Sequence, residues 1–147
     1  MPVLRAEVQG GQSMRTAKTF QSLIEALCKK HGADLKAQDV HLRLENGAYM
    51  PLVIEKHGLM ISVAHYYKGG GDTLPDPDVE LFAGYEEWVP AAISDCFGYR
   101  RTVILSADGK RVERFWRKSQ ADLASFCAQW GRNLRQQAWL QNGVRHA

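Results

Sequence analysis

Two segments of the chain, one near each end, place their hydrophobic residues at helical spacing. Between residues 13 and 31 these positions recur every three or four residues and share one helical face. They are Phe20, Leu23, Ile24, Leu27 and Cys28. Lys29, Lys30 and His31 would fall in the last turn, where cations suit the helix dipole, and Gly32 follows as a C-cap. The pattern predicts an amphipathic helix from Ser13 to His31.

The second helical pattern begins near Ser119, which is a good N-cap, with Asp122 as a weaker capping-box acid. Its hydrophobic residues follow one face to about Gln141. They are Leu123, Phe126, Cys127, Trp130, Leu134 and Ala138. Trp139 falls off this stripe, which predicts an exposed side chain.

Between the helices, hydrophobic and polar residues alternate in the manner of strands. The predicted strands span residues 40–45, 49–55, 59–67, 79–83, 99–106 and 111–117. Asn46-Gly47 predicts a type I′ hairpin turn, Pro51 an edge position, and residues 107–110 a second turn. Residues 84–98 show no clear period, and we expect a turn of helix there inside a long connection.

This order of elements predicts an α+β fold, an antiparallel sheet of about five or six strands with N- and C-terminal helices packed on one face. We expect one domain over residues 13–142, with flexible tails at 1–12 and 143–147. The other face of the sheet would carry Tyr66, Glu80, Phe82 and Phe115, and exposed aromatic residues there would mark a partner surface.

Composition places the chain among globular proteins, since 45% of its 147 residues are hydrophobic. Neither a membrane-spanning run nor a signal peptide is evident. The three cysteines are widely spaced and have no metal or redox spacing, which predicts a reduced, cytoplasmic protein. We expect Cys28 and Cys127 to be packing residues on the helical faces.

Charge is divided unevenly along the chain. Residues 1–98 hold nine Lys/Arg against thirteen Asp/Glu, a net of −4, whereas residues 99–147 hold ten against three, a net of +7. A basic C-terminal third is typical either of a solvated surface or of a site for nucleic acid or an acidic protein. Aromatic residues are interleaved with the cations, as in nucleic-acid sites and protein hot spots. The candidate contact residues are Arg100, Arg101, Arg111, Arg114, Arg117, Lys118, Arg132, Arg135 and Trp139.

Residues 65–80 concentrate the groups that could perform chemistry. Carboxylates with a nearby His have the types needed to hold Mg²⁺ or Mn²⁺, and the candidate set is His65, Asp76, Asp78 and Glu80. The structural alternative is a turn in which Gly69 to Gly71 supply positive φ and the prolines fix φ. Strand alternation turns Asp78 and Glu80 toward solvent and His65 toward the core, which favours the structural interpretation.

A nuclease-like pattern is also present in outline. Pro75-Asp76 is followed some thirty residues later by Asp108-Gly109-Lys110, whose acid and Lys resemble a metal-dependent site. The second element should then lie within a strand, whereas Asp108-Gly109 predicts a turn. Because no P-loop, dinucleotide fingerprint, nucleophile elbow or His-Glu-x-x-His motif occurs, we expect no cofactor.

One motif runs from His65-Tyr66-Tyr67 through Gly71-Asp72 to residues 76–80, and a second covers residues 126–137, including Trp130 and Asn133-Leu134. Together these motifs resemble an uncharacterised family of small bacterial domains encoded on plasmids and integrative elements. The similarity covers most of residues 14–141, with Gly69-Gly70 replacing more polar residues. It implies a mobile-element context and carries over no activity.

We therefore expect a non-enzymatic accessory protein of a bacterial mobile element that binds a protein or nucleic acid. One form of such a protein is a host-defence inhibitor of the anti-CRISPR type. The alternative is a metal-dependent, nuclease-like enzyme that uses residues 65–80.

Overall fold

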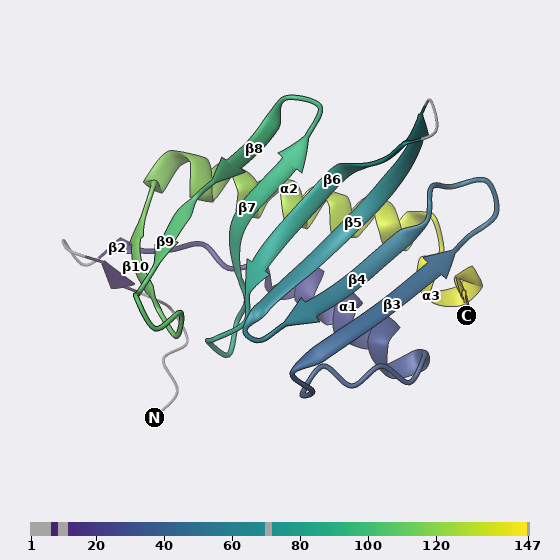
Figure 1. Cartoon of the computed structure of the whole chain (residues 1–147), viewed down its shortest axis with the longest axis horizontal. Helices are drawn as coiled ribbons and strands as arrows, with labels where there is room; N and C mark the ends of the chain where they lie inside the picture. Colours follow the sequence, from purple (N-terminus) through teal and green to yellow (C-terminus); the bar gives the residue numbers. More distant parts are fainter. Residues whose placement is uncertain (1–6, 9–11, 70–71, 147) are drawn as a thin grey trace.

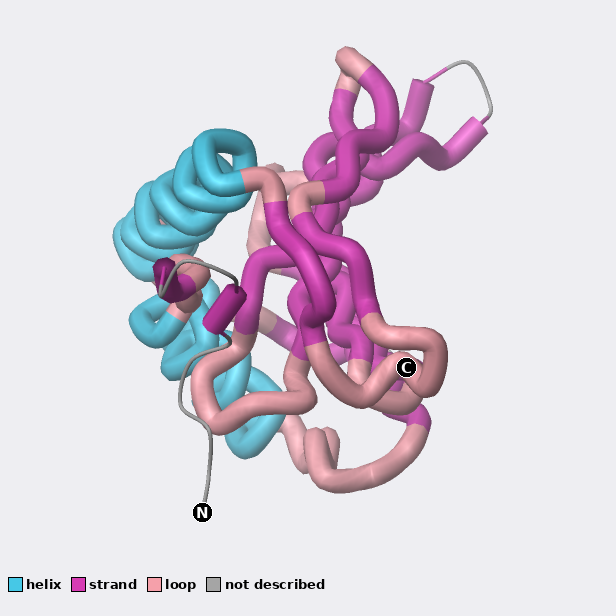
Figure 2. Tube along the Cα trace, turned by 90° about the vertical axis from the view of Figure 1, so that its left-hand side faces the viewer, coloured by secondary structure: helices cyan, strands magenta, loops and turns pink. Residues whose placement is uncertain are grey.

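The chain folds into one antiparallel sheet with helices on one side (Figure 1). The structure is a computed structural model, and it describes residues 7–8, 12–69 and 72–146. The main sheet has seven strands in the order β11-β3-β4-β5-β6-β7-β8. Figure 2 shows the helices gathered on the same side of the strands. The predicted α+β fold is confirmed.

The strands of the main sheet differ in length. They are β3 (Asp39–Glu45), β4 (Leu52–His57), β5 (Met60–Gly69), β6 (Asp72–Phe82), β7 (Val89–Asp95), β8 (Gly98–Arg101) and β11 (Val144–Arg145). β9 (Val103–Leu105) pairs with β10 (Val112–Phe115), and β1 (Glu7–Val8) pairs with β2 (Gln12–Ser13). The helices are α1 (Lys18–Lys30), α2 (Arg117–Gln136) and α3 (Trp139–Asn142). Among the residues that the structure describes, no helix is long and apolar enough to cross a membrane.

The two ends of the chain hold short strands in segments expected to be tails. Residues 1–6 and 9–11 of the N-terminal segment lie outside the described residues, while β1 and β2 fall within it. At the other end, β11 pairs with β3 and so extends the main sheet.

Helix α1 begins at Lys18, five residues later than predicted. The preceding residues are held by other contacts, because Gln120 Oε1 accepts the Arg15 N–H and the Trp88 carbonyl accepts the Ala17 N–H. The hydrophobic face of α1 is fully buried against the sheet, as predicted, and Gly32 has a φ of +73° just beyond the end of the helix. That left-handed conformation suits glycine.

The predicted tight turn at Asn46-Gly47 is wrong. Six residues separate β3 from β4, and only Gly47 of the pair has a positive φ, whereas a type I′ turn needs both. The Asn46 side chain instead donates a 2.8 Å hydrogen bond to the Gln137 carbonyl, which ties this loop to the end of α2. Pro51 precedes β4, and β4 is an interior strand rather than an edge.

Residues 84–98 contain a core strand where a turn of helix was expected. β7 pairs with β6 on one side and β8 on the other. Its register against β6 shifts between Glu80 and Leu81, which pair with Ala92 and Pro90. Such a bulge accommodates Pro90, which has no N–H to donate to a regular ladder. The bulge also hides the strand, because it interrupts the alternation of hydrophobic and polar residues.

The strand predicted over residues 99–106 is divided at Thr102. The Thr102 N–H donates to the Ala91 carbonyl at 2.8 Å, and its own carbonyl accepts the Trp116 N–H at 3.0 Å. The chain thus pairs with β7 before Thr102 and with β10 after it. The predicted turn at residues 107–110 is present, with Gly109 at a φ of +72°.

The β9–β10 hairpin covers a second, smaller core at one end of the sheet. Phe82 is fully buried there, so its predicted exposure is wrong. Its ring packs at 5.3 Å against that of Tyr85. The other members of this cluster include Met14, Val89, Ala91, Val103 and Val112.

Helix α2 starts directly after Trp116, and Ser119 lies inside its first turn rather than at the N-cap. The helix ends at Gln136 because Ala138 adopts a left-handed conformation with φ +60° and ψ +36°. This break turns the short helix α3 inward, and Trp139 becomes fully buried. The prediction that Trp139 is an exposed contact residue is therefore wrong.

Replacing Ala138 by glycine should stabilise the protein. A left-handed alanine costs roughly 1–2 kcal/mol, of which the greater freedom of glycine in the unfolded chain cancels about 0.5–1 kcal/mol. We expect Ala138→Gly to raise the free energy of unfolding by about 0.5 kcal/mol in urea titrations. Ala128→Gly, inside α2, is the matched control and should lower it by about 0.5–1 kcal/mol. A loss of stability in Ala138→Gly would contradict the left-handed assignment.

Candidate functional site

The sheet itself separates the groups that were candidates for catalysis. His65 lies on the helix-covered face with Ile61 and Val63, whereas Asp78 and Glu80 lie on the open face, in register with Ala64 and Ser62. Asp76 is exposed farther out on β6. His65 therefore does not share a site with the carboxylates, so the four residues do not converge on one substrate or ion.

His65 is buried in an aromatic cluster. Its ring centroid lies 5.5 Å from that of Trp130 and 5.8 Å from that of Trp139, and its Nδ1 lies 3.2 Å from the Pro51 carbonyl oxygen. Burial lowers its pKa, although the hydrogen bonds to Pro51 and Met50 partly offset the effect. A neutral ring that donates to a carbonyl and packs between tryptophans is a structural element that joins β5 to α2 and α3.

The open face carries half-buried carboxylates at its centre. The Ser62 hydroxyl donates a 2.6 Å hydrogen bond to Asp78 Oδ1, yet burial keeps the pKa of Asp78 above its usual value. The pKa of Glu80 is also raised, first by burial and then by the charge of Asp78. Tyr99, which hydrogen-bonds to Glu80, and the charge of Arg101 act in the opposite direction. Burial and the charges of Asp78 and Glu55 likewise raise the pKa of Tyr66.

The predicted metal chemistry finds little support in this geometry. Within residues 7–8, 12–69 and 72–146, no group of three or more His, Cys, Asp or Glu side chains is arranged to hold a metal ion. The predicted Gly69–Gly71 turn lies partly outside these ranges, at residues 70 and 71. Cys28 and Cys127 are buried, and burial raises the pKa of each thiol to about 12.

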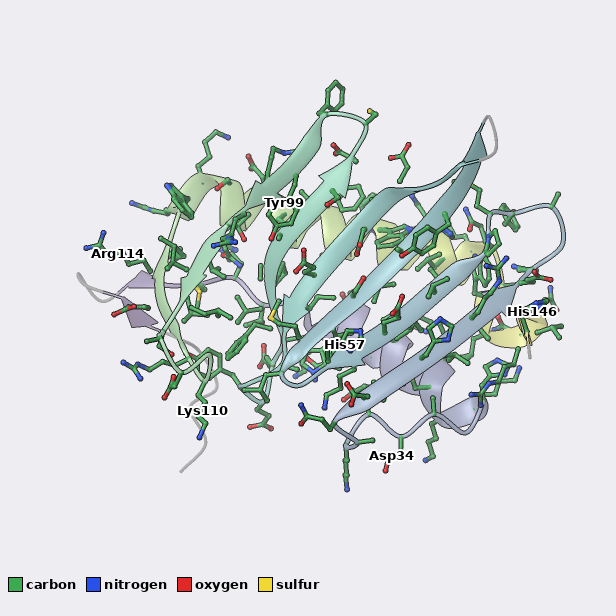
Figure 3. The ribbon with its side chains drawn as sticks, viewed as in Figure 1. Asp34, His57, Tyr99, Lys110, Arg114 and His146 are labelled. Atoms are coloured by element: carbon green, nitrogen blue, oxygen red, sulfur yellow. The ribbon has the colours of Figure 1, made fainter. Side chains whose placement is uncertain are left out.

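The nuclease-like pair of motifs lies on different elements, β6 and the β9–β10 turn. Asp108 belongs to the β9–β10 turn, where its Oδ1 accepts hydrogen bonds from the Ser106 hydroxyl at 2.6 Å and the Lys110 N–H at 3.0 Å. Figure 3 shows Lys110 at that turn, whereas Pro75-Asp76 lies within β6 of the main sheet. Asp108 therefore acts as a turn residue.

The candidate basic residues fall into two groups separated along α2. Arg117 and Lys118 begin the helix, while Arg132 and Arg135 lie about 22 Å farther along it, at 1.5 Å per residue. The remaining candidates lie near the start of the helix, on β8, β10 and the turn before β10. They are Arg100, Arg101, Arg111 and Arg114. Figure 3 shows Arg114 at this end, far from His146. Arg117, Lys118 and these four arginines therefore form a basic end of the molecule.

Some charges at the basic end are already matched. Arg100 donates two hydrogen bonds to Asp95, at 2.9 and 2.8 Å, and this pairing lowers the pKa of Asp95. Lys118 lies 3.2 Å from Asp122. These pairs reduce the excess positive charge that a polyanion would meet.

A pocket lies on the open face beside β8. It has a volume of about 270 Å³, and Glu80, Tyr99 and Arg101 supply its polar groups. Its apolar wall comes from the start of β5, the middle of β7 and β9. The residues of that wall are Met60, Ala91, Ala92, Val103, Ile104 and Leu105.

A second pocket lies on the helix-covered side of the same strand. Its volume is about 340 Å³, and α2 and the β7–β8 hairpin form its walls. Leu123, Phe126 and Ile93 make it apolar, while the Arg100–Asp95 pair lies at its rim. β8 therefore has one pocket on each face of the sheet.

Exposed aromatic side chains surround β8. Phe97, in the β7–β8 turn, is 85% exposed, Tyr99 on β8 is 53% exposed, and Trp116 before α2 is 52% exposed. Phe126 is 39% exposed, although the helical pattern assigned it to the buried face. Sequence reasoning missed Phe97 because β7 was not recognised. The signal was available, since a Phe in a two-residue turn between strands has no core to enter.

A family model for a domain of unknown function, DUF6908, matches residues 18–140. The chain belongs to this family. The matched region runs from α1 to α3 and so includes β8 and both pockets. No curated protein and no solved structure matches the chain. The predicted membership of an uncharacterised domain family is confirmed.

Replacing Glu80 should produce a pH-dependent gain in stability. Because the folded-state pKa of Glu80 is raised above 4.5, ionisation destabilises the fold as the pH rises through that value. Glu80→Gln still accepts a hydrogen bond from Tyr99 but cannot ionise. Its melting temperature should exceed that of the wild type at pH 7, and the difference should vanish below about pH 4.

Glu86→Gln is the matched control, since Glu86 is exposed and outside the pocket. The difference in melting temperature between Glu86→Gln and the wild type should be the same at pH 7 and pH 4. A Glu80→Gln variant that is less stable than the wild type at pH 7 would contradict the assigned environment.

Proposed function

We propose that this chain is a non-enzymatic binding module whose partner is a protein. The observation that carries the proposal is the exposed aromatic rim around β8, which consists of Phe97, Tyr99, Trp116 and Phe126. Large aromatic residues left in water at one end of a folded domain are typical of protein contact sites. Arg100 and Arg101 lie on the strand that they surround, and arginine is likewise enriched at binding hot spots.

The rest of the molecule supports a binding role over catalysis. His65 is neutral and enclosed, and the carboxylates of the open face are separated from it by the sheet. Protein is favoured over nucleic acid because the cations divide into two groups and Arg100 and Lys118 already pair with carboxylates. A mixed surface of arginine, acid and aromatic groups fits a protein better than a polyanion.

The biological setting is part of the proposal. The resemblance in residues 65–80 and 126–137 supports an accessory protein of a bacterial mobile element, working in the cytoplasm, where its thiols stay reduced. Inhibition of host defence, as by anti-CRISPR proteins, is one form that such binding would take.

Photocrosslinking from the rim tests the protein-binding role. With p-benzoylphenylalanine in place of Phe97, irradiation of host cells should yield a discrete adduct between the full chain and a second protein. The same amino acid at Lys36, an exposed position before β3, is the matched control and should yield none. Failure of positions 97, 116 and 126 to give any protein adduct would reject the proposal.

Nucleic acid is the second candidate, supported by the exposed Arg111, Arg114 and Arg117 at the basic end. It predicts that the chain retards duplex or single-stranded DNA in gels at low salt and releases it steeply as salt rises. Arg114→Glu/Arg117→Glu should lose this retardation, whereas Arg132→Glu/Arg135→Glu, with the same charge change, should keep it. No retardation at low salt would reject this candidate.

A further inference from the structure

The outer edge of β8 is open in a way that follows from the switch of pairing at Thr102. β10 occupies the position beside β9, and the chain then leaves at Trp116 to begin α2. Among the described residues, no strand pairs with β8 on the side away from β7. The sheet therefore has a gap along the outer edge of β8, which we call the notch. It is four residues long and continues the line of β10.

The main chain along this notch offers hydrogen-bonding groups to solvent. The Thr102 N–H points inward to Ala91, and main-chain groups alternate in direction along a strand. The N–H and C=O groups of Tyr99 and Arg101 therefore face away from β7. All four residues of β8 are exposed.

The side chains of an added strand would point to both faces of the sheet, each of which has a pocket near β8. Successive residues of a strand alternate between the faces of a sheet. On the open face, one set would lie beside Tyr99 and Arg101, which form the outer wall of a pocket that extends inward over β7 to Glu80 and Met60. On the other face, the alternate set would meet the pocket of Leu123 and Phe126. An edge strand with pockets on both faces has the features used to bind extended peptides.

We propose that β8 receives an extended, acidic segment of a partner protein as an added strand. This inference rests on the proposed protein-binding function and assigns it a partner chemistry. Main-chain bonds to Tyr99 and Arg101 would hold the segment, and apolar side chains would enter the helix-side pocket. The strand is about 14 Å long, at 3.4 Å per residue, which limits the paired region to about four residues.

Charge around the notch favours acidic residues in that segment. Arg100 and Lys118 are paired with Asp95 and Asp122, and Glu80 lies in the open-face pocket. Arg101, on the open face, and Arg117, in the first turn of α2, have no salt bridge among the described residues. That turn contains no acidic residue and no side-chain cap, so its positive dipole end is not offset from within the helix. The same cations disfavour a second copy of this chain, because pairing of two β8 edges would bring four arginines together.

Peptide selection against the full chain tests the proposal. Random twelve-residue peptides displayed on phage would be selected on the immobilised protein, and the enriched sequences synthesised for fluorescence polarisation. We expect enrichment of peptides that combine Asp or Glu with apolar residues at alternate positions. Arg117→Glu should weaken their affinity at least tenfold, whereas Arg132→Glu, with the same charge change on the same helix, should change it less than twofold.

The mode of binding is tested on the peptide, so that protein folding is not at issue. Two peptides would be made, each N-methylated at one of the two sets of alternate amides. The peptide whose methyl groups replace the N–H donors facing β8 should lose binding, and the other should keep it. In hydrogen exchange followed by NMR, the amides of Tyr99 and Arg101 should gain protection when the peptide binds.

Three results would overturn the proposal. They are selection of no peptides or of basic ones, equal binding after N-methylation in both registers, and a dimer in sedimentation that the peptides do not dissociate. If they occur while Phe97 still crosslinks to a protein, the binding function stands and the added-strand mode is rejected. If crosslinking also fails, both are rejected.

Discussion

The change of pairing at Thr102 determines the shape of the end of the molecule that carries β8. Its N–H binds the Ala91 carbonyl, its hydroxyl donates to the Pro90 carbonyl at 2.9 Å, and its own carbonyl accepts from Trp116. It is almost fully buried. One residue thus joins the bulge of β7, the end of β10 and the start of α2. Buried main-chain groups must be paired, so the strand cannot continue past this point unchanged.

Two consequences follow from that arrangement. The β9–β10 hairpin is directed across one end of the open face, where it buries Phe82 in a second core and forms the wall of a pocket. The outer edge of β8 is left unpaired because the chain begins α2 at the point where β10 would have to continue beside it. Main-chain groups and pockets are therefore exposed together, on a rigid element of the sheet.

The helix-covered face shows the opposite arrangement, in which potential chemistry is enclosed. His65, Trp130 and Trp139 pack together from β5, α2 and α3, and Asn46 ties the β3–β4 loop to the same end of α2. These contacts stabilise the fold and leave the carboxylates Asp78 and Glu80 without a histidine partner. The acidic motif that looks most like an active site in the sequence is therefore divided between the core and the open face.

What the sequence determined by itself is local and periodic. Hydrophobic spacing identified both long helices, most strands and the α+β arrangement, and the alternation around Asp78, Glu80 and His65 assigned each to its correct face. These predictions succeed because periodicity reports which side of an element meets a core, whatever the core is.

Tertiary structure decided the features that depend on contacts between distant residues. β7 was hidden by a bulge that its neighbours accommodate, Trp139 entered the core through the left-handed turn at Ala138, and the edge of β8 opened through the hydrogen bonds of Thr102. None of these has a repeating pattern, because each depends on a single residue meeting a partner brought near by the fold. The candidate contact surface was therefore visible in the sequence only as a basic, aromatic third of the chain.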